Sequence, residues 1–179
     1  AGTMGGGIAM SFANAGIPVT LIETGDEQLK RGMGVMQKNY ENTAARGGIP
    51  ADAPAKRMGL INGVVGLEHV KDADLIIEAV FETMAIKKEV FTALDKYAKP
   101  GAVLASNTSY LNINEIAAVT KRPQDVLGMH FFSPANVMKL CEIVRAEKTA
   151  PDALVTAVAV AKRIAKVPAV VGVCDGFVG

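Results

Sequence analysis

His130 and Glu142 are the residues of this chain whose types and surroundings best suit proton transfer. His130 is one of only two histidines and follows a short apolar run at residues 126–129. Glu142 lies twelve residues further on, inside the mostly apolar run 137–144. A buried carboxylate needs a partner, and an imidazole, which titrates near neutral pH, suits that role. The pattern predicts a histidine base held by a carboxylate; the alternative is a structural histidine beside an ordinary strand-edge acid.

Glycines at the start of the chain indicate a second kind of chemistry. Gly2 and Gly5 match the second and third glycines of the G-x-G-x-x-G pattern, with Thr3 and Met4 between them. In that pattern a helix begins at a pyrophosphate; its first glycine and its strand would precede residue 1. The next apolar run ends on Glu23, twenty-one residues after Gly2. An acid there binds a ribose 2′-hydroxyl and repels a 2′-phosphate, so the spacing predicts NAD in preference to NADP.

Polar residues also follow two further apolar runs. Glu78 and Glu82 flank the end of the run at residues 74–80, and Lys87 lies five residues past Glu82. A solvated pair at the start of a helix is the alternative reading of these charges. Residues 107–109 (Asn-Thr-Ser) follow the next run. They are either an ordinary turn or the donors and acceptors that a dehydrogenase needs around a substrate hydroxyl or carbonyl.

The elements that must position these residues alternate between strand and helix, which predicts an α/β fold with a doubly wound, mostly parallel, Rossmann-like sheet that lacks its first strand here. His130 is expected at the carboxyl end of its strand, where open α/β sheets place their chemistry. Helices are expected up to residue 15 and over 26–46, 52–60, 86–97, 112–119 and 151–166, and strands over 19–22, 74–80, 102–106, 126–129, 137–144 and 167–173.

Composition excludes several classes of protein. Apolar residues make up 50% of the 179 and the net charge is +1, so the chain can bury a sizeable core. Trp is absent and no basic stripe contains interleaved aromatics, so nucleic acid is not an expected partner. No run approaches the roughly eighteen apolar residues of a membrane span. Cys141 and Cys174 lie in apolar runs without metal-ligand spacing and are expected to be reduced core residues, with no metal site.

Five segments, taken in order, resemble the NAD-binding domain of the L-3-hydroxyacyl-CoA dehydrogenases. They are residues 1–9, 77–82, 106–109, 128–134 and 137–142. The resemblance covers the whole chain. It is closest to the multifunctional enzymes that carry an enoyl-CoA hydratase ahead of this domain, because Ser133 stands where many stand-alone members have asparagine.

The resemblance implies three groups of site residues. The catalytic group is His130, Glu142 and Ser109, with Ser109 near the substrate hydroxyl. The positions that line the cofactor are Gly2, Thr3, Met4, Gly5, Glu23, Glu82, Lys87 and Asn107. Substrate contacts are implied for Ser109 and, by a looser match to positions that meet CoA, for Asn39 and Arg46.

The implied reaction is NAD-dependent oxidation of (S)-3-hydroxyacyl-CoA to 3-oxoacyl-CoA, in fatty-acid β-oxidation or a related CoA pathway. Residues 1–174 are expected to form the NAD-binding domain, and 175–179 to begin the link to a helical substrate and dimerisation domain. The chain is therefore expected to be a fragment of a larger enzyme. That enzyme is expected to be a homodimer or to carry the fused hydratase, in the cytoplasm of a bacterium or in the peroxisome or mitochondrion of a eukaryote.

Three alternatives remain at this point. A β-hydroxyacid dehydrogenase of the 6-phosphogluconate type shares the opening loop but typically uses a catalytic lysine. A structural relative such as the lens protein lambda-crystallin looks like the same family without serving as an enzyme. A cofactor-binding module with only a regulatory role is the third. The His130 and Glu142 pair counts against the first alternative, and the joint presence of His130, Glu142 and Ser109 disfavours the second.

Overall fold

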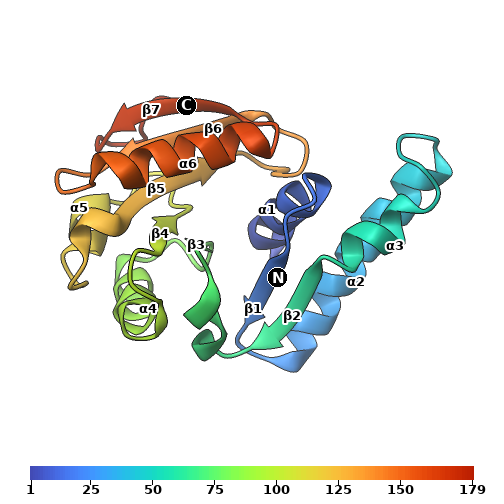
Figure 1. Cartoon of the computed structure of the whole chain (residues 1–179), viewed down its shortest axis with the longest axis horizontal. Coiled ribbons are helices and arrows are strands. Elements are labelled where there is room, and N and C mark those ends of the chain that lie inside the picture. Colours follow the sequence, from blue (N-terminus) through green and yellow to red (C-terminus); the bar gives the residue numbers. More distant parts are fainter. The chain divides into compact units, whose positions relative to one another are not determined.

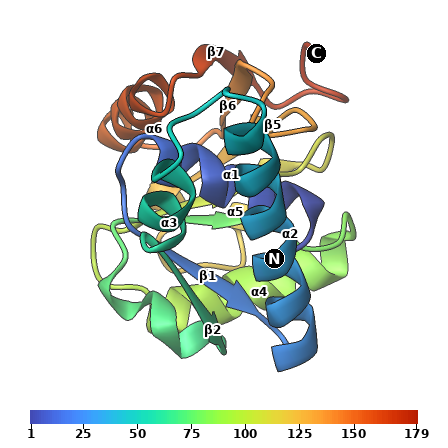
Figure 2. The ribbon, with the colours of Figure 1, turned by 90° about the vertical axis from the view of Figure 1, so that its right-hand side faces the viewer.

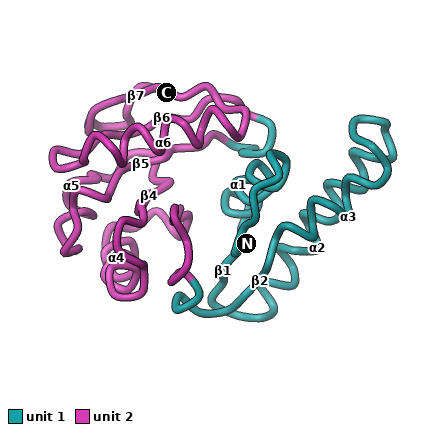
Figure 3. The backbone as a smooth tube through the Cα atoms, viewed as in Figure 1, with its two compact units in different colours: residues 1–69, 133–137 teal, residues 70–132, 138–179 magenta.

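Strands and helices alternate along most of the chain in the computed structural model, which describes residues 1–179 (Figure 1). The chain divides into unit 1 (residues 1–69 and 133–137) and unit 2 (residues 70–132 and 138–179), coloured separately in Figure 3. The elements are α1 (Thr3–Asn14), β1 (Val19–Glu23), α2 (Asp26–Ala45), α3 (Ala53–Met58), β2 (Ile61–Val65), η1 (Leu67–Asp72), β3 (Leu75–Glu78), α4 (Met84–Tyr97), β4 (Val103–Ser106), α5 (Ile113–Ala117), η2 (Pro123–Asp125), β5 (Val126–Phe131), β6 (Leu140–Arg145), α6 (Pro151–Arg163) and β7 (Val167–Gly172).

Unit 1 consists of a two-stranded parallel sheet and the helices packed on it (Figure 2). α1 packs against β1, and α2 against both strands. The long helix α2 is mostly polar, and its buried residues Gly32, Met36 and Tyr40 recur every four positions. This spacing places them on one face, which is how an amphipathic helix covers a sheet. The hydroxyl of Tyr40 lies 3.2 Å from the carbonyl oxygen of Met10 and so ties α2 to α1.

Unit 2 contains a five-stranded sheet in the order β3-β4-β5-β6-β7. All neighbouring strands in it are parallel except β5 and β6. These two strands are joined by only eight residues, 132–139, whereas a parallel connection needs a dozen or more. β4 is buried along its whole length, as expected for a central strand covered on both faces. The predicted α/β fold with a mostly parallel, Rossmann-like sheet is confirmed.

Three elements were not predicted, namely β2 and the short 3₁₀ helices η1 and η2. β2 contains Asn62 and Gly63, two residue types that disfavour strands. Its pairing with β1 decides its conformation instead, and a side chain at Gly63 would lie 2.9 Å from Leu29 of α2. Gly63 therefore allows α2 to pack closely over this strand.

Two details of the prediction were wrong. β5 continues to Phe131, two residues past the predicted end, and His130 is its penultimate residue, so the strand bound was wrong while the place of His130 at the carboxyl end was right. Cys174 is exposed because β7 ends at Gly172, whereas Cys141 is buried as predicted and burial raises the pKa of its thiol to about 12. None of the helices combines the length and the apolar character that a membrane crossing requires.

Candidate active site

His130 and Glu142 lie directly opposite each other on the antiparallel strands β5 and β6. Residues paired in this way project their side chains on the same face of a sheet. His130 Nδ1 is 2.7 Å from Glu142 Oε2, so the hydrogen bond predicted between the two side chains is present. The Glu142 side chain is 1% exposed and that of His130 12%. Because a carboxylate only accepts hydrogen bonds, the proton of a neutral His130 belongs on Nδ1, which leaves Nε2 as the acceptor.

The second oxygen of Glu142 accepts two backbone hydrogen bonds near the end of the chain. The N–H groups of Val178 and Gly179 lie 3.0 Å and 2.8 Å from Oε1. Two aromatic rings flank the histidine: the ring centroids of Phe132 and Phe177 lie 4.4 Å and 5.9 Å from that of His130. Sequence reasoning missed both features, since backbone donors leave no signal in residue type and Phe177 reads as an ordinary apolar residue.

The loop after β4 carries the next group of predicted residues. Asn107 Oδ1 accepts a hydrogen bond of 2.8 Å from the N–H of Phe131, the residue after His130. The N–H of Asn107 in turn donates to the carbonyl oxygen of Glu78. Asn107 therefore connects the ends of β3 and β4 to the strand of the histidine. Ser109, two residues on, is partly exposed, and its hydroxyl forms no hydrogen bond within the chain.

Glu82 is anchored to the same loop by Thr108. The buried Thr108 hydroxyl donates to Glu82 Oε1, while the N–H of Leu111 donates to Thr108 Oγ1 at 2.9 Å. Thr108 was not singled out from the sequence, where it read as part of a turn. It fixes the backbone on either side of Ser109 and the position of the Glu82 carboxylate together.

Glu78 and Lys87 form a fully buried ion pair inside unit 2. Lys87 Nζ lies 2.7 Å from Glu78 Oε1, and the two side chains are 0% and 1% exposed. The other carboxylate oxygen accepts from the Ser106 hydroxyl at 2.6 Å, and the N–H of Val80 donates to Oε1 at 2.7 Å. The alternative of a solvated pair is therefore wrong for Glu78. The structure directs the Lys87 ammonium to Glu78, while Glu82 is bound by Thr108.

In unit 1, the first turn of α1 is open toward an anion. Gly2 caps the helix without a side-chain hydrogen bond, and the first turn contains no acidic residue. The N–H groups of a first helical turn have no partners within the helix. A Cβ atom added to Gly2 or Gly5 would meet nothing within 4 Å, whereas one on Gly7 would lie 3.1 Å from Cβ of Ala135. The loop thus fits a dinucleotide pyrophosphate: exposed N–H groups at the front and a glycine where the helix packs closely.

Glu23 lies at the end of β1, as the spacing required. Its Oε2 accepts a hydrogen bond of 3.0 Å from the N–H of Thr24, and its Oε1 accepts one from the backbone nitrogen of Ala1. Burial raises the pKa of Glu23, and the hydrogen bond from Thr24 lowers it. Glutamate ordinarily titrates well below neutral pH, so the side chain is an anion there.

Because the Glu23 carboxylate would repel a 2′-phosphate and bind a ribose 2′-hydroxyl, the full-length protein should bind NADH at least about tenfold more tightly than NADPH. Fluorescence titration of each nucleotide measures the ratio. Glu23→Gln removes the charge and keeps the size of the side chain, so it should reduce the ratio of NADH affinity to NADPH affinity. Equal affinities in the unmodified protein would show that Glu23 does not select the cofactor.

Asn39 and Arg46 lie seven residues apart at the exposed face and the C-terminal end of α2. A spacing of seven brings two residues to the same side of a helix. Both side chains are exposed and could contact a ligand, although no hydrogen bond or cavity marks them as a site.

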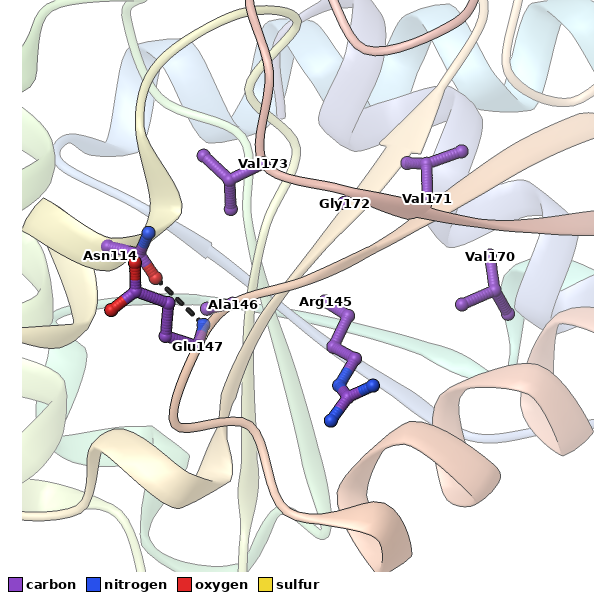
Figure 4. Close-up of a pocket in the computed structure, with 8 residues that line it drawn as sticks. All are labelled: Asn114, Arg145, Ala146, Glu147, Val170, Val171, Gly172 and Val173. Carbon is purple, nitrogen blue, oxygen red and sulfur yellow. Dashed lines mark hydrogen bonds between the residues drawn. The ribbon is translucent and has the colours of Figure 1, made fainter.

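The cavity shown in Figure 4 lies outside the predicted site. Its volume is about 410 Å³, and it is lined by Asn114, Arg145, Ala146, Glu147, Val170, Val171, Gly172 and Val173, none of them a predicted site residue.

The features of the two units define a class of protein. Unit 1 has a glycine-led helix and an acid at the end of the following strand, and unit 2 has a carboxylate-bound histidine on a mostly parallel sheet. The glycine-led helix, the acid and the mostly parallel sheet are typical of Rossmann-like dinucleotide-binding proteins. The family model of the 3-hydroxyacyl-CoA dehydrogenase, NAD binding domain matches residues 1–174, and the chain therefore belongs to this family.

Comparisons with individual proteins agree with the family. The chain is 44% identical to the peroxisomal bifunctional enzyme of Danio rerio over 99% of its own length and 24% of the relative's. It is 40% identical to a peroxisomal fatty acid beta-oxidation multifunctional protein of Oryza sativa subsp. japonica, covering 98% of the chain and 24% of the relative. Among solved structures, FadB2 of M. tuberculosis superposes with a TM-score of 0.97 at 38% identity, covering 99% of this chain and 63% of that one.

A 3-hydroxybutyryl-CoA dehydrogenase from Escherichia coli K12 superposes with a TM-score of 0.96 at 33% identity, over 99% of this chain and 38% of that one. The predicted family and the predicted cofactor, NAD, are thereby confirmed. The chain spans about a quarter of the length of the curated relatives it matches.

Proposed function

We propose that the full-length protein oxidises (S)-3-hydroxyacyl-CoA to 3-oxoacyl-CoA with NAD, in fatty-acid β-oxidation or a related CoA pathway. The observation that carries this proposal is the hydrogen bond of 2.7 Å between His130 Nδ1 and Glu142 Oε2, which leaves Nε2 as a proton acceptor. The names of the relatives support it, since they include a 3-hydroxybutyryl-CoA dehydrogenase and a fatty acid beta-oxidation multifunctional protein.

In this proposal His130 Nε2 accepts the proton of the C3 hydroxyl group. Glu142 keeps the imidazole in its orientation and stabilises the imidazolium that forms. NAD, when bound, supplies the acceptor for the hydride that leaves C3. General-base catalysis of this kind contributes about 10²- to 10⁴-fold in rate. The buried, hydrogen-bonded position of Glu142 suits it to balance the charge that develops on the ring.

Ser109 is proposed to bind the substrate oxygen, because its hydroxyl is partly exposed and not engaged within the chain. Thr108 and Asn107 hold the backbone around it. We propose that Asn39 and Arg46 contact the CoA moiety. For the cofactor, the proposed contacts are the helix start formed by Gly2, Thr3, Met4 and Gly5 for the pyrophosphate, Glu23 for the ribose, and Glu82 and Asn107 for the nicotinamide pocket. The resemblance also implies Lys87 for this pocket, but its side chain is 0% exposed and its ammonium is bound to Glu78, so we propose no direct contact for it.

We also propose the wider context of the reaction. Residues 1–174 are the NAD-binding domain and residues 175–179 begin the link to a helical domain, with the complete protein either a homodimer or fused to an enoyl-CoA hydratase. Relatives named peroxisomal support a peroxisomal place in a eukaryote, among the proposed places, which also include the mitochondrion and the bacterial cytoplasm.

Reduction of acetoacetyl-CoA by NADH tests the proposed function. The purified full-length protein should consume NADH with saturation in both substrates, and Ser109→Ala should lower kcat/KM by at least about tenfold because a hydrogen bond to the reacting oxygen is lost. Saturable NADH binding without turnover would contradict the proposal and favour a structural or regulatory relative.

A further inference from the structure

Two successive residues with positive φ turn the backbone toward Glu142. Gly176 has φ of 69° and Phe177 has φ of 55°. Positive φ is uncommon for a bulky residue such as phenylalanine. Here Phe177 is only 7% exposed, and its N–H donates to the carbonyl oxygen of Cys174. Consecutive N–H groups after such a turn can converge on one anion. The two that follow, from Val178 and Gly179, both reach Glu142 Oε1.

These contacts divide the two oxygens of Glu142 between different donors. Oε1 receives the two backbone N–H groups, and Oε2 receives His130 Nδ1. The last torsion of a glutamate side chain is soft and roughly two-fold, so that by itself it does not hold the carboxyl plane in one orientation. The backbone of Val178 and Gly179 supplies that constraint. All three neighbours donate, which matches an acceptor-only carboxylate.

Gly179 also lacks the room for a side chain. An added Cβ would lie 2.5 Å from Cζ and 2.9 Å from Cε1 of Phe132, and 3.4 Å from Glu142 Oε1. The ring of Phe132 lies against His130, with 4.4 Å between the ring centroids. A side chain at position 179 therefore has to displace either the ring beside the histidine or its own N–H from Glu142.

We propose that the backbone N–H groups of Val178 and Gly179, here termed the backbone donor pair, position Glu142 and through it hold His130 in the tautomer with the proton on Nδ1. The donor pair acts as a positioning element and need not touch the substrate. Its catalytic consequence rests on the proposed function, whereas the tautomer of His130 can be observed without any turnover.

The test uses the full-length protein with ¹⁵N-labelled histidine, and the His130 signals are those lost in His130→Gln. In the unmodified protein the neutral ring should carry its proton on Nδ1. Gly179→Ala should give a mixture of tautomers and lower kcat for acetoacetyl-CoA reduction at least about tenfold, since small displacements of catalytic groups have large effects on rate. The affinity for NADH should change less than about threefold, because the donor pair makes no cofactor contact in this proposal.

A matched control is Gly172→Ala, because a Cβ at Gly172 meets nothing within 4 Å. It should leave both the tautomer and kcat unchanged. A Gly179→Ala protein with the original tautomer and the original kcat would overturn the proposal.

If Gly179→Ala folds poorly, a second variant tests whether the backbone donor pair orients residue 142. In Glu142→Gln the donor pair should retain the amide oxygen, so that the amide NH₂ group faces Nδ1 and the ring proton moves to Nε2. Retention of the Nδ1 proton in this variant would show that the donor pair does not orient residue 142. If the predicted tautomers are observed but the unmodified protein shows no turnover of acyl-CoA substrates, the proposed function fails and the positioning role stands.

Discussion

Replacing His130 by Gln should lower kcat for acetoacetyl-CoA reduction in the full-length protein by at least about a hundredfold, because the proton-transfer group is lost. Glutamine retains a polar side chain of similar reach opposite Glu142, so the sheet should keep its register. The affinity for NADH should be nearly unchanged, since no proposed cofactor contact is removed. Steady-state kinetics and NADH fluorescence titration on the same preparation measure the two effects separately.

The control for this variant is His69→Gln, which replaces the other histidine of the chain at an exposed position of η1. It should leave kcat within about twofold of the original value, as is usual for surface substitutions. Near-normal turnover in His130→Gln would return His130 to a structural role.

Replacing Glu78 by Ala should destabilise unit 2 by about 3–5 kcal/mol, the usual cost of removing one member of a buried ion pair. The change leaves the ammonium of Lys87, which is 0% exposed, without its carboxylate. It also removes the acceptor for Ser106 and for the N–H of Val80. Amide hydrogen exchange in β3 and β4 reports local opening free energies, and it should become at least about a hundredfold faster at this cost.

An exposed ion pair on the same helix provides the control. Lys88 of α4 pairs with Glu115, and both side chains are partly solvated at 36% and 53% exposure. Glu115→Ala should therefore cost no more than about 1 kcal/mol. The double variant Glu78→Met with Lys87→Met should be more stable than Glu78→Ala, because no uncompensated charge remains buried. Similar exchange rates in Glu78→Ala and Glu115→Ala would contradict a structural role for the buried pair.

The parts of the fold that were predictable from the sequence are those with a strong local pattern. The N-cap of α5 is an example, since Asn112 Oδ1 accepts the N–H of Asn114 as an asparagine cap should. The buried run that became β4 is another. By contrast, β2 depends on pairing with β1 and on the fit of Leu29 over Gly63, contacts that no window of sequence contains. The same limit explains the end of β5, which the partner strand β6 extends past His130.

In the candidate site, too, some contacts were predictable from the sequence and others depend on the fold. His130 and Glu142 could be paired from residue type alone, because a buried acid needs a donor. The partner of Lys87 could not, since Glu78 and Glu82 are both near in sequence and only the fold selects Glu78. The backbone donors at Val178 and Gly179 could not be predicted from the sequence, because every non-proline residue carries an N–H group. Only the folded geometry decides which N–H groups converge on the Glu142 carboxylate.

The most direct test of the central claim is the formation of NADH from NAD by the full-length protein, measured with (S)-3-hydroxybutyryl-CoA and, in parallel, with free 3-hydroxybutyrate. A 3-hydroxyacyl-CoA dehydrogenase that uses His130 as its base should oxidise the thioester and leave the free acid essentially unreacted, because binding of the CoA portion positions the reacting carbon. Oxidation of the free acid at a comparable rate would contradict the account in favour of a β-hydroxyacid dehydrogenase, and no oxidation of either compound would contradict the proposed catalytic role of His130.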